Sequence, residues 1–500
     1  MPEKWRKKRW KGNGMKESSI EVIYNVLNSL SYVLVFYVAF ITLVYISLFI
    51  IAAVKLFREK DVKPIQYDKI LSSELAPPLS ILVPAYNEEV NIVWSVRSLL
   101  GINYKQFEIV VINDGSKDST AQSLITEFQM VEVKSKVQWS GLGRETKPIR
   151  GIYRSLQHHN LVLVDKENGG KADALNVGIN VCQYPYFASL DGDTVLDTDA
   201  FIKVMKPVMD ALPGEEIVAT GGSVGIANGS YVDSGHLSSE NVLLSRKPLV
   251  IMQVIEYLRA FLMGRVGLSR FNILLIVSGA FGVFKKDWVI EAGGYEPGTI
   301  GEDMELIVRL HRRIREKKSK ARIVYVPDPV CWTEAPETVK VLHRQRTRWH
   351  RGLFESLWKH KVMLLNPHYG RIGMVAMPYF VFVELLGPVV EVLGILTVVL
   401  GLSLQLVNTQ LSLALFLVMV IYGSLLSVGA VLFEQWCVGR YNKVADLFRL
   451  FFYALSEAFW FRPLMTAWRL KGLFQAVRGK QHQWGDMVRG NVMNSKKPGA

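Results

Sequence analysis

The uneven distribution of apolar residues most constrains how this chain can fold. Residues 31–54 and 373–436 are almost free of charged side chains, whereas residues 57–350 have the mixed composition of a globular domain. A helix needs about 20 apolar residues to cross the hydrocarbon core of a bilayer, and each segment supplies them. The sequence therefore predicts a globular domain of catalytic type set between membrane segments.

The apolar segments differ in length and polarity. Residues 20–57 are long for one crossing and short for two, so we expect an interfacial lead-in followed by one tilted span over residues 31–54. Residues 374–402 and 411–435 predict two further spans joined by an uncharged loop. Residues 447–468 are apolar but hold several charged side chains, so a channel-lining span and an interfacial helix both fit this segment.

Two acidic residues, Glu384 and Glu391, fall inside the first of these two C-terminal spans. A carboxylate is costly in hydrocarbon, so in membrane proteins it faces the protein interior or a water-filled cavity. We therefore expect both side chains to face a protein interior or a polar path.

Charge is also unevenly placed. The formal net charge is +14, and basic residues crowd the first 16 positions and the tail from Lys471. Basic ends beside apolar segments favour membrane lipids with anionic head groups as partners. No nucleic-acid-binding motif accompanies them, which argues against nucleic acid as a partner.

The cysteines, Cys182, Cys331 and Cys437, are widely separated in the sequence. They have neither the spacing of metal ligands nor that of a disulfide framework, which fits a domain on the reducing, cytosolic side of a membrane.

The central domain begins with alternating strand and helix signals. A buried strand over residues 79–83 ends in a turn, and a helix follows over residues 90–100, with Asn87 as its expected cap. Residues 107–112 and 161–164 are two more buried strands, each followed by a helix. This order predicts parallel βαβ units in an α/β fold.

In such sheets, ligands bind beyond the carboxyl ends of the strands. The stretch from Pro84 to Glu88, Asp114 and Asp191 all lie at such strand ends. Taken alone, Asp114 is better explained as a turn residue that caps the following helix.

Residues 133–160 are irregular, polar and basic, and we expect an insertion there.

The stretch Asp191-Gly192-Asp193 follows a short strand signal at residues 186–188. Two carboxylates separated by one residue at a strand end can hold one hard divalent cation, and the cation can hold a diphosphate. The same pattern is common in solvated turns. The pair therefore predicts a metal site only in combination with its neighbours.

A second candidate site opens the helix after the third strand. Gly169, Gly170 and Lys171 expose backbone N–H groups and add a positive charge at a helix start, which is typical of an anion site. A capped turn with a surface lysine explains the segment equally well.

Later segments add further candidates. Glu302 and Asp303 begin a helix, where acidic residues are also ordinary partners of the helix dipole. Gln345 and Arg348 share one face of another helix, in a basic and aromatic cluster that also fits a stripe along a membrane surface. The small residues in 276–284 allow close approach of a backbone, and ordinary core packing explains them as well.

Taken together, these stretches resemble the family 2 glycosyltransferases, in particular the processive membrane synthases of cellulose, hyaluronan and poly-β-1,6-N-acetylglucosamine. The motifs that carry the resemblance are Pro84-Ala85-Tyr86-Asn87-Glu88, Asp114, Gly170-Lys171-Ala172, Asp191-Gly192-Asp193, Glu302-Asp303 and Gln345-x-x-Arg348-Trp349. The resemblance is strong over residues 79–352 and loose in the membrane part. It implies a GT-A fold, a UDP-sugar donor, Mg²⁺ or Mn²⁺ as cofactor, and an inverting mechanism that makes β-linkages.

The resemblance also implies a role for each residue. Contacts to the nucleotide sugar are expected from Pro84, Tyr86, Glu88, Asp114, Lys171, Asp191, Gln345 and Arg348. Within this set, Asp114 is expected on the uracil or ribose, and Lys171 on the phosphate side. Asp193 is the expected metal ligand, and Asp303 the expected general base. Glu302 and Trp349 are expected at the acceptor end, where a flat indole suits a sugar face.

The implied enzyme is a membrane-embedded hexosyltransferase that extends a β-linked polysaccharide and translocates it, with UDP-N-acetylglucosamine weakly favoured as donor. One alternative is a non-processive enzyme that adds a single sugar to a lipid-linked acceptor. The other is a catalytically inactive membrane scaffold or transporter. The cluster from Gln345 to Trp349 and the several C-terminal spans favour the first of these three functions.

Two departures from the family pattern are present. Gly301 precedes the Glu-Asp pair, where the family often has threonine. No clear cyclic-dinucleotide-binding extension follows the last apolar segment, so regulation of that kind would need an accessory subunit, whose identity is unknown.

These observations predict four regions: a basic N-terminus with a membrane helix (1–57), a cytosolic GT-A domain with interfacial helices (58–366), transmembrane and interfacial helices (367–475) and a basic tail (476–500). UDP-sugars are cytosolic, so we expect a multi-pass protein of the cell membrane with its catalytic domain inside. A single N-terminal span then places the basic residues 1–19 outside, against the positive-inside tendency. Either residues 20–57 form a re-entrant or double pass, or the basic residues after the span (Lys55, Arg58, Lys60 and Lys63) and the folded domain determine the orientation.

Overall fold

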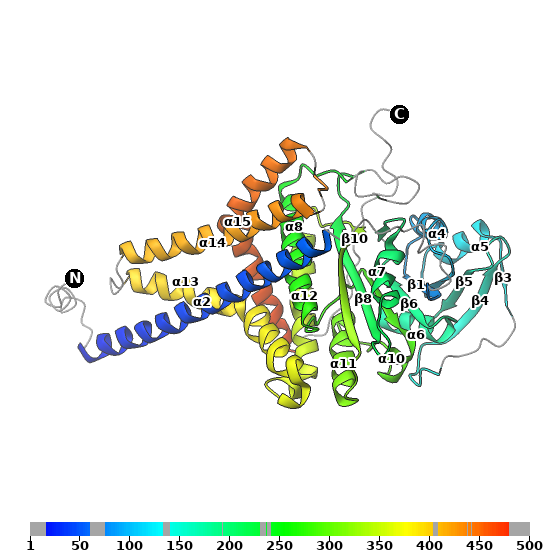
Figure 1. Cartoon of the computed structure of the whole chain (residues 1–500), viewed down its shortest axis with the longest axis horizontal. Coiled ribbons are helices and arrows are strands. Elements are labelled where there is room, and N and C mark those ends of the chain that lie inside the picture. Colours follow the sequence, from blue (N-terminus) through cyan, green and yellow to red (C-terminus); the bar gives the residue numbers. More distant parts are fainter. Residues whose placement is uncertain are drawn as a thin grey trace.

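The computed structural model describes residues 17–60, 76–133, 141–192, 194–230, 237, 242–403, 409–437, 439–441 and 443–479. A mixed α/β sheet forms one side of the molecule, and long helices extend from the other side (Figure 1). In the described part of the chain, the strands in spatial order are β3 (Met130–Glu132), β4 (Ile149–Ser155), β5 (Leu161–Lys166), β2 (Phe107–Asp114), β1 (Leu79–Ala85), β6 (Tyr186–Leu190), β9 (Phe281–Lys285), β8 (Ile217–Ile226), β10 (Arg322–Thr333) and β7 (Val195–Leu196).

The centre of the sheet consists of the parallel strands β5, β2, β1 and β6. Their residues are mostly apolar and buried along almost the whole strand, as in strands covered on both faces. Helix α6 (Lys171–Val181) packs against β1 and β2. The predicted parallel βαβ units are therefore confirmed. Strand β9 runs antiparallel to β6 and makes the sheet mixed.

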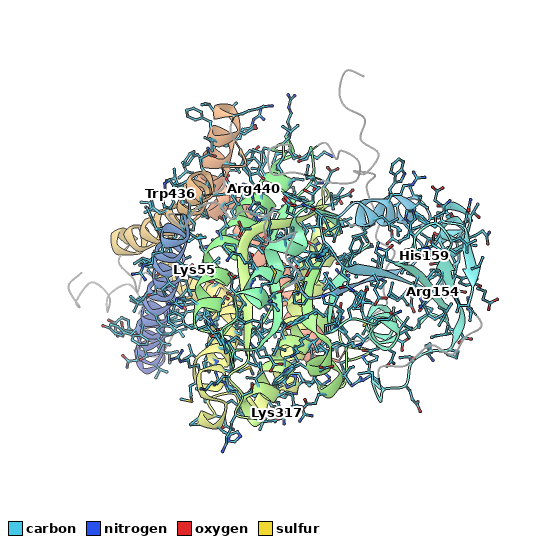
Figure 2. The ribbon with its side chains drawn as sticks, turned by 45° about the vertical axis from the view of Figure 1, so that its right-hand side comes forward. Lys55, Arg154, His159, Lys317, Trp436 and Arg440 are labelled. Atoms are coloured by element: carbon cyan, nitrogen blue, oxygen red, sulfur yellow. The ribbon has the colours of Figure 1, made fainter. Side chains whose placement is uncertain are left out.

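The prediction of an irregular insertion over residues 133–160 is wrong. Strand β4 lies within it and pairs antiparallel with both β3 and β5 near the edge of the sheet. Arg154 of this strand lies at the end of the molecule away from Trp436 of the long helices (Figure 2). Exposed basic residues interrupt the apolar pattern of β4, as is common near sheet edges, and so conceal the strand in the sequence.

Asn87 does not cap the first helix of the domain, contrary to expectation. Helix α4 (Ile92–Leu100) begins after Asn91, and Asn87 adopts a φ of 54° in the turn after β1. The side-chain oxygen of Asn87 accepts a hydrogen bond from the N–H of Lys117 at 2.9 Å, and its own N–H donates to Ser116 Oγ at 3.0 Å. Asn87 therefore ties together the two loops that follow β1 and β2.

The N-terminal helix α2 (Glu17–Lys60) contains the predicted span over residues 31–54. Its segment Tyr24–Arg58 has a mean hydropathy of 2.7 and is, among the described residues, the one unbroken helix long and apolar enough to cross a membrane. Its outer surface carries exposed apolar side chains such as Phe36. The helix thus has the length and surface of a membrane span.

The span predicted over residues 374–402 is divided into two parts. The structure has π-helical segments up to Leu385 and then helix α13 (Gly387–Ser403), with a bend of 45° between the two parts. Pro388 lies in the first turn of α13 and has no N–H for a hydrogen bond to the preceding turn, which explains a break at this position. If this bent pair is one span, it is a second candidate membrane crossing.

Helices α14 (Thr409–Cys437) and α15 (Val444–Val477) complete the helical part. Helix α15 packs along α12 (Val339–Lys359), and a Cβ added at Gly472 would lie only 2.6 Å from the Thr347 carbonyl oxygen. The absence of a side chain at Gly472 thus allows these two helices to touch along their backbones.

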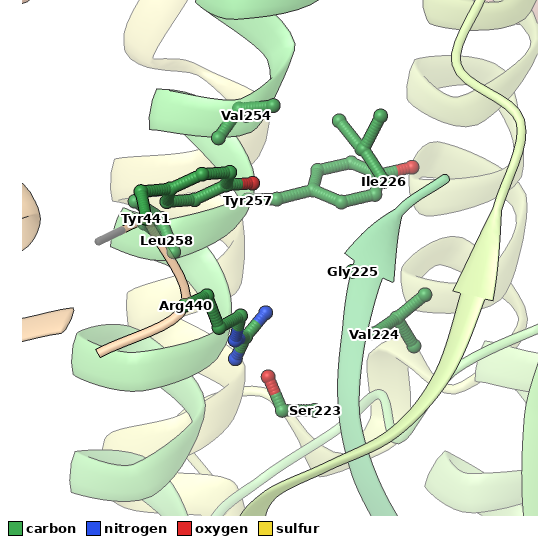
Figure 3. A pocket seen from close by; sticks show the side chains of 9 residues that line it. All are labelled: Ser223, Val224, Gly225, Ile226, Val254, Tyr257, Leu258, Arg440 and Tyr441. Atoms are coloured by element: carbon green, nitrogen blue, oxygen red, sulfur yellow. The ribbon is translucent and has the colours of Figure 1, made fainter. Parts of the chain in front are cut away.

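A second junction is made by Arg440, in the loop between α14 and α15. Arg440 reaches a cavity of about 10 Å³ between β8 and α8 (Pro248–Leu258). Figure 3 shows its guanidinium pointing toward the hydroxyl of Ser223 on β8. Its Nε lies 3.4 Å from the buried carboxylate of Glu434. The loop between the last two helices is therefore anchored in the sheet domain.

Candidate active site

A cleft of about 1960 Å³ lies beyond the carboxyl ends of β1, β2 and β6 and continues between α8, the π-helical segment η3 (Arg259–Arg265), the start of α11 (Glu302–Glu316) and α12. It is lined by every predicted site residue that the structure describes: Pro84, Tyr86, Glu88, Asp114, Lys171, Asp191, Glu302, Asp303, Gln345, Arg348 and Trp349. The predicted metal ligand, Asp193, lies outside the described residues. Residues separated by more than 250 positions thus share one cavity.

Asp114 ends strand β2, and three donors hold its carboxylate. The ammonium of Lys166 lies 2.6 Å from Oδ1, and the N–H groups of Gly169 and Gly170 donate to the two oxygens at 3.0 and 2.7 Å. Lys166 is fully buried and also lies 2.6 Å from the carboxylate of Asp173. The Asp114 carboxylate therefore orders the glycine turn that precedes α6 and still borders the cleft.

Sequence reasoning missed Lys166. Asp114 and Lys166 are paired in register at the carboxyl ends of neighbouring parallel strands. A lysine at the end of an otherwise apolar, buried strand needs a negative partner, because an isolated buried charge is very costly. This need for a negative partner is the feature of the sequence from which the pair of Lys166 and Asp114 could have been predicted.

The turn after β1 packs on the turn after β6. Tyr86 is 42% exposed, and Glu88 is buried. A Cβ added at Gly192 would lie 3.6 Å from Glu88 Oε1, and the Ser95 hydroxyl donates to the Gly192 carbonyl at 2.9 Å. These contacts hold Asp191 and the loop beside it against the turn that carries Tyr86.

Lys171, the first residue of α6, lies at the centre of the cleft. Its ammonium is 2.6 Å from Asp191 Oδ1 and 3.4 Å from Glu302 Oε1, and it donates to the Gly279 carbonyl at 3.1 Å. Burial alone would lower the pKa of Lys171, but the carboxylates of Asp191 and Glu302 outweigh it and raise the pKa, so the side chain stays charged. Lys171 thus links the strand-end carboxylate to the helix that carries Asp303.

Glu302 and Asp303 occupy the first turn of α11. Burial raises the pKa of the Glu302 carboxyl, Lys171 opposes this effect, and the charge of Asp303 adds to it. Asp303 packs on the small-residue run, since a Cβ added at Gly279 would lie 2.8 Å from Asp303 Oδ2. The close approach expected in this run therefore occurs, and the group that approaches is the predicted base.

The structure gives a physical account of Gly301, which stands where the family often has threonine. A Cβ added at Gly301 would lie 3.1 Å from the backbone of Gly352 on α12, and a Cβ at Gly352 would lie 3.0 Å from the backbone of Gly301. The two backbones are in direct contact. This pair of glycines brings the first turn of α11 against α12 and the residues of α12 that line the cleft.

Helix α12 contributes Gln345, Arg348 and Trp349 to the cleft wall, and Trp349 is 43% exposed. Sequence reasoning singled out neither Arg346, which also lines the cleft, nor Glu256 of α8, which lies 2.8 Å from it. A buried arginine requires a counter-charge, but a partner 90 positions away cannot be identified from spacing.

Among the described residues, no three His, Cys, Asp or Glu side chains lie close enough to form a metal site. A Mg²⁺ ion bound with a nucleotide needs only one or two protein carboxylates, because phosphates and water supply the other ligands. Asp191 fits this requirement, since its side chain is 36% exposed at the cleft and its carboxylate already faces a cation, the Lys171 ammonium.

Known sequence families and proteins are similar to this chain. The sequence family described as "Glycosyltransferase like family 2" matches residues 77–352, and the family described as "Chitin synthase" matches residues 299–478. The structure of a mannosyltransferase from Pyrobaculum calidifontis, in complex with GDP-Man and Mn²⁺, gives a TM-score of 0.47 at 17% sequence identity, covering 87% of this chain and 99% of that chain.

Two curated relatives are poly-β-1,6-N-acetyl-D-glucosamine synthases. The one from Staphylococcus aureus (strain COL) is 30% identical over 282 residues, which are 56% of this chain and 55% of the relative. The one from Staphylococcus epidermidis is 30% identical over 329 residues, 65% of each protein. This chain thus matches about half the length of the first relative.

The fold class expected from the resemblance, an α/β domain of the GT-A type, agrees with the mixed sheet and with the family match. Because that match spans more than half of the chain, the protein belongs to glycosyltransferase family 2.

Proposed function

We propose that this protein is a metal-dependent, inverting glycosyltransferase that transfers a sugar from a UDP-sugar to a growing β-linked polysaccharide. The observation that carries the proposal is the single cleft that joins Asp114 and Asp191 at the strand ends to Asp303 and Trp349. The names of the staphylococcal relatives support N-acetylglucosamine as the sugar, and hence UDP-N-acetylglucosamine as the donor.

In the proposed reaction, Asp303 takes the proton from an acceptor hydroxyl as its oxygen attacks the anomeric carbon of the donor sugar. The new carbon–oxygen bond forms on the face opposite the departing UDP, so one displacement inverts the configuration and no second carboxylate is needed as a nucleophile. Lys171 offers positive charge on the phosphate side, and the roles of Gln345 and Arg348 on the diphosphate follow from the family resemblance.

A divalent cation, when bound, offsets the charge that develops on the leaving diphosphate. Asp193 and the neighbouring Asp191 are the residues that would hold it. The Asp191 carboxylate borders the cleft beside Lys171, and the turn that follows it packs against Glu88 and Ser95. These contacts support a site for a cation and a diphosphate at this end of the cleft.

We also propose that the product passes along the helical part of a multi-pass protein in the cell membrane, with the catalytic domain in the cytosol. The cleft extends past Trp349 to Phe380, Glu384 and Arg469, residues of the C-terminal helices. Glu384 lines this cleft, as expected, whereas Glu391 is exposed and does not face the interior; its carboxylate accepts a hydrogen bond from the Thr466 hydroxyl. The apolar surface of α2 supports attachment to the membrane.

Donor turnover tests this proposal. The purified protein in detergent or nanodiscs would be incubated with Mn²⁺ and UDP-N-acetylglucosamine, UDP-glucose or UDP-glucuronate, and released UDP would be measured. We expect release from UDP-N-acetylglucosamine, and loss of transfer but not of UDP binding in Asp303→Asn. The matched control is Glu316→Gln at the other end of α11. Absence of UDP release with every donor would favour an inactive scaffold, and full activity of Asp303→Asn would exclude Asp303 as the base.

A further inference from the structure

One carboxylate in the cleft serves two arginines from different helices. Glu256, near the end of α8, lies 2.8 Å from Nη2 of Arg346 on α12 and 3.6 Å from Nη2 of Arg469 on α15. The Arg346 side chain is 3% exposed, whereas that of Arg469 is 37% exposed. Because all three side chains line the cleft, this junction of α8, α12 and α15 forms part of its wall.

Arg346 has a second contact, to the residue proposed to meet the acceptor sugar. Its guanidinium carbon lies 4.3 Å from the centre of the Trp349 ring. A guanidinium near the face of an indole is attracted by the ring electrons, and its flat shape restricts the orientation of the ring. Trp349 is 43% exposed, so contact with Arg346 fixes a side chain that is otherwise only partly packed.

The buried position of Arg346 makes Glu256 necessary. A buried guanidinium without a counter-charge carries a large desolvation penalty, so it would move toward water if the carboxylate were removed. Such a movement would take the cation away from the Trp349 ring. The position of the indole therefore depends on a carboxylate that belongs to another helix.

We propose that Glu256 is a positioning residue for the acceptor: it holds Arg346, and Arg346 holds the indole of Trp349 in the orientation that receives the acceptor sugar. Arg469 ties the same carboxylate to α15, so the position of this C-terminal helix is linked to the acceptor end of the cleft. This inference rests on the proposed function and adds to it the residues that set acceptor geometry.

The test measures coupling between transfer and donor breakdown. If Trp349 loses its orientation, water replaces the misplaced acceptor, and less sugar enters product for each UDP released. For Glu256→Gln we expect this ratio to fall roughly threefold or more, as for coupled residues in contact. UDP affinity should stay close to that of the unchanged protein. Glu216→Gln, which removes the ion pair with Lys285 on the other side of the sheet domain, is the matched control.

A double-mutant cycle separates positioning from a general structural role. In a Trp349→Ala background, Glu256→Gln should cause almost no further loss, because its effect passes through the indole. Arg346→Lys keeps the positive charge but loses the flat guanidinium, and it should lower the same ratio. This variant also tests the proposal where Glu256→Gln does not fold.

Two results would overturn the inference. In the first, the double variant lowers the ratio of sugar transferred to UDP released by the product of the two single-variant factors, so that Glu256→Gln and Trp349→Ala act independently. In the second, Glu256→Gln lowers UDP affinity and transfer by the same factor, as expected for a merely structural ion pair. Failure of the proposed function is distinguishable from both, because the unchanged protein would then release no UDP from any donor.

Discussion

The ammonium of Lys171 lies 2.6 Å from the carboxylate of Asp191, at the point where the strand-end residues meet the helix that carries Asp303. An ammonium has three N–H donors, and the contacts of Lys171 with Asp191, Glu302 and the Gly279 carbonyl are enough to use all of them. A diphosphate that enters the cleft must therefore share or displace one of these contacts.

Replacement of Lys171 by glutamine should weaken UDP binding. The change leaves Asp191 and Glu302 without their common cation, so the negative diphosphate would meet two uncompensated carboxylates. Hydrogen bonds to charged groups contribute about 1.5–3 kcal/mol, which predicts a loss of UDP affinity of roughly tenfold or more. Titration calorimetry with UDP and Mn²⁺ would measure it. Lys203→Gln removes a comparable pair with Asp197 outside the cleft and is the control; equal effects of the two variants would contradict this role.

Gly279→Ala should lower kcat while the fold is retained. The added Cβ would lie 2.8 Å from Asp303 Oδ2, so the proposed base must shift. A misplacement of about 1 Å can lower a rate by about 100-fold, and we expect a loss of at least about tenfold. UDP release and the thermal unfolding midpoint would be compared with those of Gly143→Ala, where the added Cβ meets no atom within 4 Å. An active Gly279→Ala enzyme would show that Asp303 tolerates displacement and would weaken its assignment as the base.

Metal removal should abolish turnover. EDTA should stop UDP release, and Mn²⁺ or Mg²⁺ should restore it, because a cation held by Asp191 and Asp193 would offset the negative charge of the diphosphate, which otherwise meets these carboxylates directly. Asp193→Asn should raise the Mn²⁺ concentration needed for half-maximal donor binding. Asp210→Asn, an exposed residue paired with Lys206, is the control. If the Mn²⁺ dependence of Asp193→Asn matched that of the unchanged protein, Asp193 would not be a ligand.

His311 should make the stability of the domain depend on pH. Burial lowers the pKa of His311 from 6.5 to about 4, and its Nε2 lies 2.9 Å from the Leu274 carbonyl oxygen. Between these two pH values the unfolded chain binds a proton that the folded chain does not, so stability is full above about pH 6.5 and falls as the pH falls toward 4. The total loss is roughly 3 kcal/mol, at about 1.4 kcal/mol for each pKa unit.

The midpoint of thermal unfolding between pH 7 and 4.5 would measure this effect. His311→Gln keeps a neutral donor for the Leu274 carbonyl and should reduce the decline; the part that remains is expected from His350, whose pKa burial also lowers to about 4. His159 is exposed, so His159→Gln should leave the decline unchanged. An identical decline in the His311 variant would place the acid sensitivity elsewhere in the chain.

The sequence predicted the fold best in the central strands, where burial on both faces of the sheet requires apolar residues. Strands such as 107–112 are almost wholly apolar, as is typical of the centre of a parallel sheet. The residues that follow such strands converge because the carboxyl ends of parallel strands share one edge. The residues at strand ends, such as Asp114 and Asp191, could therefore be expected in one cleft from the pattern of strands. Glu302, Asp303, Gln345, Arg348 and Trp349 lie on helices α11 and α12, and only the family resemblance led us to expect them in the same site.

The partners of these residues could not be predicted in the same way. The pair of Arg346 with Glu256 and the contact of Gly301 with Gly352 depend on how helices far apart in sequence pack together. Strand β4 was missed because its exposed face carries Arg150 and Arg154. The bend before α13 was missed because Pro388, inside a mostly apolar segment, was not interpreted as a break. The first error arises because pairing with β3 and β5 decides the structure of this segment, whereas the second overlooked a local signal, the proline.

Product length tests the central claim most directly. The purified protein in nanodiscs would receive radiolabelled UDP-N-acetylglucosamine and Mn²⁺, and the product would be resolved on a gel beside that of Asp303→Asn. A long polymer from this donor, absent with Asp303→Asn, is the predicted result. A product extended by a single sugar, formed only when a lipid acceptor is added, would contradict polymer synthesis and assign the protein to the non-processive glycosyltransferases.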